Sequence, residues 1–255
     1  MKMLIALAAG TLGLCCSSSF AQKPAAPATP QPKPSPRAMA FEDLTGYWVS
    51  VVTEDWVYRM IMPAKGDAGS LPVNADARKA AESFDAAADK AKGEACRMNG
   101  AAGNIRRPGR LHISWADDAH LKVEFSAGEQ TRTFGFEPPG TAGAPSWTGD
   151  SVAEWSKVRN YQQFGPPLVA PVGGTLKVNT TNMRPGYLQA NGFPYSATTK
   201  MTEFYDRVEV NGTPWLIVTT VVEDPVYLRD TLYWSTPFKR EADGHAWKVK
   251  PCGEV

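Results

Sequence analysis

Cysteine and histidine are scarce in this chain of 255 residues, which has four of the first and three of the second. Cys15 and Cys16 lie in an apolar N-terminal run, whereas Cys96 and Cys252 are far apart in the rest of the chain. Neither Cys96 nor Cys252 belongs to a Cys-x-x-Cys motif or has a histidine at ligand spacing. The sequence therefore predicts no redox centre and no metal site.

Motifs that mark catalysis or cofactor binding are also missing. The chain has no His-Glu-x-x-His, no Gly-x-Ser-x-Gly, no P-loop and no dinucleotide fingerprint. His112 alternates with apolar neighbours, and His120 and His245 follow acidic turn residues. We expect all three histidines at the surface, assign no catalytic residue and expect no cofactor.

Charge of one sign is not in excess. The chain has 27 basic and 26 acidic residues, and 23 basic and 26 acidic residues remain without the first 38 positions. A nucleic-acid binder carries a marked basic footprint, and a polybasic membrane binder carries clustered lysines and arginines. This balance predicts neither class of partner.

A long apolar run occurs only at the N-terminus, where Lys2 precedes the uncharged stretch 3–14 and Ser19-Phe20-Ala21 offers a cleavage site. The pattern predicts a signal peptide over 1–21 and export to the periplasm or the medium. Acylation of Cys15 or Cys16 is the alternative, but neither follows the small residue that a lipoprotein peptidase prefers. A membrane-spanning helix needs about 20 apolar residues. We therefore expect no integral membrane segment after cleavage.

A proline- and alanine-rich stretch follows. Residues 22–38, QKPAAPATPQPKPSPRA, hold six prolines, which oppose helix and sheet and favour an extended chain. We expect a disordered linker over 22–40 that contributes nothing to stability, and a single domain over 41–255. In an exported chain, the remaining cysteine pair predicts a Cys96–Cys252 disulfide.

One helix is expected in the domain. Asn74 is a suitable N-cap, alanines and Phe84 recur at helical spacing over 74–92, and Gly93 is a natural end.

The remaining periodicity is that of strands. Alternating residues and turn signals predict strands over 47–53, 56–62, 110–115, 121–125, 130–136, 175–181, 198–210, 215–222, 232–239 and 245–249. Asn211-Gly212 is the strongest hairpin signal. The fold class is thus mainly β, an antiparallel meander barrel of roughly 8–10 strands with one inserted helix, and a sandwich is the alternative.

Candidate ligand-binding residues come from two neighbouring segments. The polar and aromatic loop 180–195 carries Arg184 and Tyr195 and is placed to form the rim of a barrel. Glu203 and Arg207 lie four residues apart on the next strand and share one face. A buried pair there would mark a site, whereas an outward-facing pair would be ordinary surface charge.

Several of these segments resemble a known family. LTGYW at 44–48, TTNMRPGY at 180–187, TEFYDR at 202–207 and VVEDP at 221–225 resemble secreted bacterial lipocalin-like, or calycin-type, proteins of uncharacterised role. The inserted helix and the length depart from true lipocalins. The resemblance implies a barrel with a cavity and assigns neither a ligand nor an activity.

Three function classes remain. The leading expectation is an exported lipocalin-like protein that binds a small apolar or amphipathic ligand in a barrel cavity. The alternatives are a periplasmic hydrolase or isomerase that uses carboxylate or histidine acid–base chemistry, and an envelope structural or interaction protein. The sequence leaves the oligomeric state open.

Overall fold

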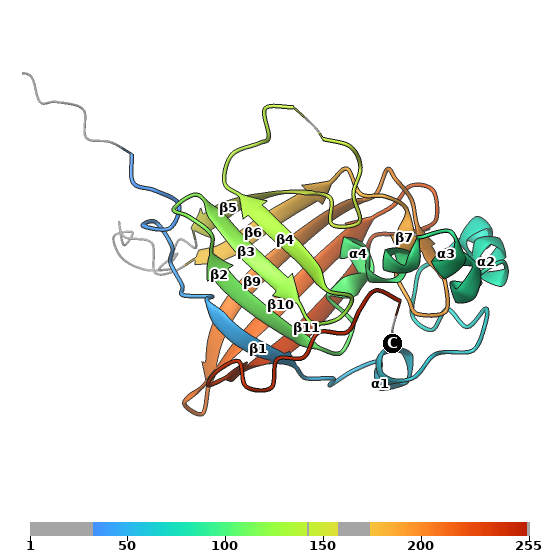
Figure 1. Cartoon of the computed structure of the whole chain (residues 1–255), viewed down its shortest axis with the longest axis horizontal. Helices are drawn as coiled ribbons and strands as arrows, with labels where there is room; N and C mark the ends of the chain where they lie inside the picture. The colour runs from blue at the N-terminus through green and yellow to red at the C-terminus, as the bar shows by residue number, and fades with distance from the viewer. Residues whose placement is uncertain (1–32, 142, 158–173, 254–255) are drawn as a thin grey trace, which may run out of the picture. The chain divides into compact units, whose positions relative to one another are not determined.

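The computed structural model describes residues 33–141, 143–157 and 174–253. Nine strands form a closed barrel in the order β1-β11-β10-β9-β6-β5-β4-β3-β2 (Figure 1). They are β1 Gly46–Ser50, β2 Arg110–Trp115, β3 His120–Phe125, β4 Gln130–Gly135, β5 Asp150–Lys157, β6 Gly174–Thr181, β9 Lys200–Val210, β10 Thr213–Glu223 and β11 Leu232–Glu241. The predicted β-barrel is confirmed. The signal peptide predicted over 1–21 lies outside the described residues.

The barrel differs from a pure antiparallel meander at one junction. Strands that alternate in direction close into a ring only when their number is even, so a ring of nine needs one parallel pair. That pair is β4 and β5, where Phe134 lies opposite Ser151. The chain after β4 returns along the outside of the barrel before β5 begins (Figure 1). β5 itself was not predicted as a strand.

The interior of the barrel is filled by large side chains. Trp48, Phe134, Tyr205 and Phe238 are at most 1% exposed and belong to one core cluster with aliphatic residues from the other strands. Side chains alternate between the two faces of each strand, and in β10 the side chains of Leu216, Val218, Thr220 and Val222 are buried whereas those between them are half-buried. The hairpin signal is also confirmed, because Asn211 and Gly212 both have positive φ.

Short helices and a small ribbon gather at one end of the barrel, which we call the helix end (Figure 1). They are α1 Trp56–Met60, α2 Ala75–Glu82, α3 Ala86–Ala91, the 3-10 helix η1 Ala95–Asn99, α4 Ala101–Asn104, β7 Gly186–Tyr187 and β8 Pro194–Tyr195. A second core cluster joins them to the barrel and includes Met183, Phe193 and Trp234. The predicted rim loop 180–195 thus folds into a buried cap.

Two predicted strands are wrong. Residues 56–62 begin with helix α1, in which the apolar side chains of Trp56 and Met60 face outward and Arg59 is buried. The chain over 245–249 forms no strand. β1 already pairs with both β11 and β2, so the closed barrel has no free edge to which another strand could add.

The predicted helix over 74–92 is divided in two. Asn74 caps α2 as expected, since its side chain accepts a hydrogen bond from the Ala77 amide. Asp85 then caps α3 by accepting from the amides of Ala87 and Ala88. Between the two helices, Phe84 packs edge-on against Tyr187 at 5.1 Å. A new cap and a half-buried aromatic ring at the break explain why one helix does not continue.

The disulfide between Cys96 and Cys252 is confirmed, and its two cysteines are 156 positions apart in the sequence. It joins η1 to the C-terminal segment. Next to it, the Gly253 amide donates to the Asn99 side chain at 3.1 Å, and Gln130 donates to Cys252 Sγ at 3.2 Å. The C-terminal segment is therefore tied to the helix end.

The end of the proline-rich stretch contacts the opposite end of the barrel. The Trp155 indole donates to the Pro36 carbonyl at 3.0 Å, and the Arg37 amide donates to the Asp118 carbonyl at 3.1 Å. The ring of Phe41 meets Trp155 edge-on at 6.2 Å. The part of the predicted linker that the structure describes, from Lys33 onward, is thus in contact with the domain near its end.

Two truncations should show which part of the segment 22–41 contributes to the stability of the domain. We expect a chain without residues 22–33 to keep the free energy of unfolding of a chain that begins at residue 22. A chain without residues 22–41 should lose about 2 kcal/mol of unfolding free energy, because the Phe41 ring and the Trp155 hydrogen bond are lost. Urea unfolding followed by circular dichroism measures both values, and equal stability of the two truncated chains would contradict the assigned contacts.

Candidate functional site

Glu203 lies inside the barrel, where it is fully buried on β9. Its partner is Arg132 of β4, whose Nη2 and Nη1 donate to the two carboxylate oxygens at 2.6 and 3.1 Å. Arg132 Nη2 also donates to Thr180, and the Tyr205 hydroxyl donates to Glu203 at 3.3 Å. The pair is neutral as a whole and is held by polar neighbours on three strands.

Arg207 does not reach Glu203. Its side chain is exposed, and its backbone amide donates to Glu42. β9 pairs with β6 only as far as Tyr205, and beyond that residue the β9–β10 hairpin projects past the barrel. From Arg207 on, the side chains on both faces of β9 are exposed. Glu203 and Arg207 therefore lie on the same face of the strand, but only Glu203 lies inside the barrel.

Arg184 and Tyr195 lie apart from both. Arg184 covers the ring of Trp147 at 3.9 Å and binds Glu94 at 2.9 Å. Tyr195 is fully buried in the cap, its hydroxyl has no partner among the described residues, and burial raises its pKa well above the ordinary value. The structure thus separates the four residues predicted to bind ligand, and that role stays a prediction for each of them.

The histidines lie outside the barrel core. His112 Nδ1 is 2.7 Å from Glu124, and its ring stacks on Tyr47. His120 Nδ1 is 2.8 Å from Asp117 at an exposed turn. Among the described residues, no three His, Cys, Asp or Glu side chains are grouped as metal ligands would be.

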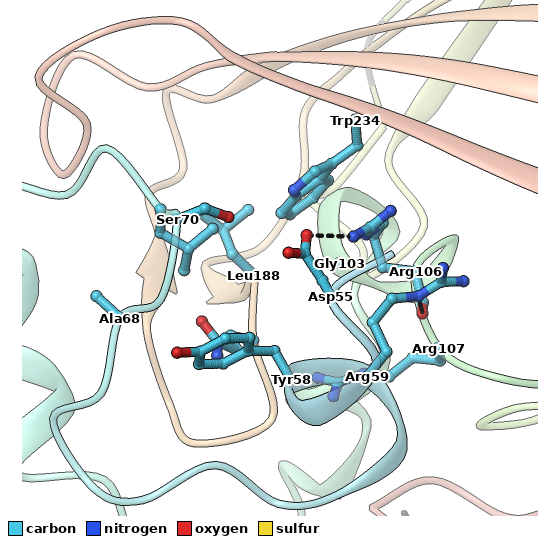
Figure 2. Close-up of a pocket in the computed structure, with 12 residues that line it drawn as sticks. Asp55, Tyr58, Arg59, Ala68, Ser70, Gly103, Arg106, Arg107, Leu188 and Trp234 are labelled. Carbon is cyan, nitrogen blue, oxygen red and sulfur yellow. Dashed lines mark hydrogen bonds and ion pairs between the residues drawn. The ribbon is translucent and has the colours of Figure 1, made fainter. Parts of the chain in front are cut away.

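A cavity of about 40 Å³ lies at the helix end, beneath α1 (Figure 2). Its walls come from five separate stretches of the chain and include both apolar and basic side chains. The lining residues are Asp55, Tyr58, Arg59, Ala68, Ser70, Leu71, Gly103, Arg106, Arg107, Leu188, Gln189 and Trp234. The volume fits a few water molecules or one group of carboxylate size.

Arg59 is the least compensated charge of this cavity. It is 8% exposed, and only its Nε has a partner, the Arg106 carbonyl at 3.0 Å. Neither Nη1 nor Nη2 finds a partner among the described residues. Burial, and next the charge of Arg106, lower the pKa of Arg59 to about 10. A buried guanidinium with two unpartnered nitrogens is costly unless an anion binds it.

Two neighbouring side chains add further donors. Arg107 donates through Nη2 to the Met98 carbonyl, while its Nε has no partner in the described part of the chain. Desolvation lowers the pKa of Arg107 to about 10. The Nε2 of Gln189 is likewise buried and unpartnered among these residues. The cavity is therefore rich in hydrogen-bond donors and poor in acceptors.

Arg106 is the third guanidinium of the cavity, and it is compensated. Its Nη1 binds Glu54 and its Nη2 binds Asp55, both at 2.8 Å, and Nη1 also donates to the Ser235 carbonyl. The guanidinium lies 5.4 Å from the centre of the Trp234 ring. Figure 2 shows the Asp55–Arg106 contact directly below Trp234. Three arginines and two carboxylates leave one positive charge in excess.

A wider hollow of about 500 Å³ adjoins the cavity on its outer side. The two spaces are neighbours, because Asp55, Ser70 and Trp234 line both. The outer part is also lined by Tyr233, which is 67% exposed. A molecule whose head entered the cavity would place its body here, against two aromatic rings.

The residues of this site were not predicted from the sequence. Two signals were present: Arg59 interrupts the apolar run WVYRMIM at 56–62, and Arg106 and Arg107 are adjacent. An arginine inside an apolar run is typical of a buried cation with a specific partner. The run itself was interpreted as a strand, which hid that signal.

Comparisons with protein-family models, curated proteins and solved structures gave no match to this chain. In the part of the chain that the structure describes, no helix has the length and apolar character needed to cross a membrane. What this protein does is therefore argued from the site itself.

Proposed function

We propose that this protein binds a small molecule with an anionic head and an apolar body, at the helix end of the barrel. The observation that carries the proposal is the buried Arg59 guanidinium, whose two Nη atoms have no partner among the described residues. An anion beside it would satisfy these donors and balance the excess charge. A carboxylate is the simplest head that matches a planar guanidinium.

The packing of the barrel favours a ligand site at the helix end over one in the barrel interior. Trp48, Phe134, Tyr205 and Phe238 occupy the centre of the barrel. The helix end instead offers a small basic cavity and, next to it, a wider hollow lined by Trp234 and Tyr233. We thus keep the amphipathic ligand expected from the sequence, but we place its binding site at the helix end and not in the barrel interior.

Export of the protein remains part of the proposal. The confirmed disulfide fits an oxidising compartment such as the periplasm or the extracellular medium. A binding protein in either place would meet its ligand outside the cytoplasm. We assign no catalytic step, because the carboxylates of the site, Glu54 and Asp55, are both engaged by Arg106.

The test uses benzoate and its neutral counterpart benzamide. Isothermal titration should show that the full mature chain binds benzoate and binds benzamide at least tenfold more weakly. Arg59→Met should weaken benzoate binding by roughly 10- to 100-fold, because a charge-assisted hydrogen bond is lost, and should not lower the melting temperature. Arg184→Met is the matched control and should bind benzoate as the unmodified chain does.

Two results would contradict the proposal. One is equal affinity for benzoate and benzamide, which would show that the cavity does not select an anion. The other is a loss of benzoate binding in Arg184→Met but not in Arg59→Met, which would place the site at the residues predicted from the sequence.

A further inference from the structure

Asp55 occupies a special place in the proposed site. It lines both the inner cavity and the outer hollow, whereas Glu54 lines the outer hollow alone. Both carboxylates bind the same guanidinium, Asp55 through Nη2 and Glu54 through Nη1 of Arg106. Of the two, Asp55 is therefore the one whose carboxylate lies where a ligand head would enter.

The backbone of Asp55 is unusual as well. Its φ of 51° and ψ of 30° place it in the left-handed region, which a residue other than glycine seldom adopts. It stands at the N-cap of α1, yet its side chain makes no capping hydrogen bond. An aspartate at this position normally accepts from the first amides of its helix. Here the carboxylate binds Arg106 instead.

The side chains of helix α1 and of its N-cap make three polar contacts with other segments. Arg59 Nε donates to the Arg106 carbonyl, the Tyr58 hydroxyl donates to Asp67, and the N-cap residue Asp55 binds the Arg106 guanidinium. The side chains on the outer face of α1 are apolar and exposed, with Trp56 61% and Met60 58% exposed. A rearrangement of the Asp55 side chain would therefore affect the position of α1, and with it Tyr58 and Arg59, which line the cavity.

We infer that Asp55 is an internal competitor, which occupies Arg106 in the free protein and is displaced by the anionic head of the ligand. The inference rests on the proposed function and adds how the site selects its ligand. The incoming carboxylate accepts from Arg106 Nη2 in place of Asp55. Asp55 is then released from the left-handed conformation and can cap α1. A neutral ligand could not exchange with Asp55, because it offers Arg106 no charge.

The experiment compares three forms of the full mature chain in benzoate titrations. Asp55→Asn keeps the shape of the side chain, and asparagine tolerates the left-handed region, but the substitution removes the competing negative charge. It should bind benzoate at least tenfold more tightly than the unmodified chain. Glu154→Gln is the control: it removes one negative charge from an exposed side chain that lines neither the cavity nor the hollow, and it should change the affinity by less than threefold.

A second measurement follows α1 without a ligand. Hydrogen exchange of the α1 amides should be faster in Asp55→Asn than in Glu154→Gln, since only the first variant weakens the contact between Asp55 and Arg106 at the start of the helix. Benzoate binding that is unchanged or weaker in Asp55→Asn would overturn the inference alone. Absence of benzoate binding in all three forms would overturn both the inference and the proposed function.

Discussion

Replacing both disulfide cysteines, in a Cys96→Ser/Cys252→Ser variant, is expected to lower the free energy of unfolding by about 5 kcal/mol, as the chain-entropy relation gives for so long a loop. The bond spans 156 residues and joins η1 to the C-terminal segment, so its loss frees the unfolded chain and loosens the helix end. Urea unfolding in the absence of reductant measures the difference between the two chains.

The control for this result is the unmodified chain in reductant, which should match the double variant. A change below about 1 kcal/mol, well under the usual range for a native disulfide, would contradict the structural role that we assign to the bond. The assigned pairing itself is checked by peptide mapping without reduction, which should recover the two cysteines in one linked peptide.

Breaking the ion pair inside the barrel should cost nearly as much. Glu203→Gln leaves the Arg132 guanidinium buried without an anion, and such a change costs about 3–5 kcal/mol. Both side chains are at most 2% exposed, so water cannot replace the lost partner. Replacing both together, in Arg132→Met/Glu203→Leu, should restore most of the stability because no charge is left behind.

A surface pair provides the comparison. Glu154 and Lys177 lie 2.9 Å apart on neighbouring strands of the same barrel, with the Glu154 side chain 61% exposed. Glu154→Gln should change the free energy of unfolding by less than about 1 kcal/mol. If Glu203→Gln and Glu154→Gln had equal effects, burial would not be what makes the Arg132–Glu203 pair important.

The sequence predicted the barrel because its signals are local. Alternation and turn residues mark β2, β3 and the β9–β10 hairpin within a few positions, and Asn74 marks the start of α2. The parallel pairing of β4 and β5 depends on how the whole ring closes, so no local pattern contains it. The local pattern of residues 245–249 was likewise insufficient. This segment forms no strand because the closed barrel leaves no free edge for it to pair with.

The site was harder to predict for a related reason. Glu203 meets an arginine 71 positions away, whereas the interpretation of the strand considered the arginine four positions away. The cavity brings together Arg59, Arg106 and Trp234 from segments that are distant in the chain. Tertiary packing decides which basic side chains keep buried nitrogens without a partner, and Arg59 is distinguished by having two of them, Nη1 and Nη2, among the described residues.

The most direct test of the proposed site is a crystal structure of residues 22–255 grown with 4-iodobenzoate. The account predicts an anomalous iodine peak in the hollow beside Trp234 and Tyr233, with the carboxylate within hydrogen-bonding distance of Arg59 or Arg106. A carboxylate bound instead at Arg184, or an iodine peak within the barrel among Trp48 and Phe134, would contradict it.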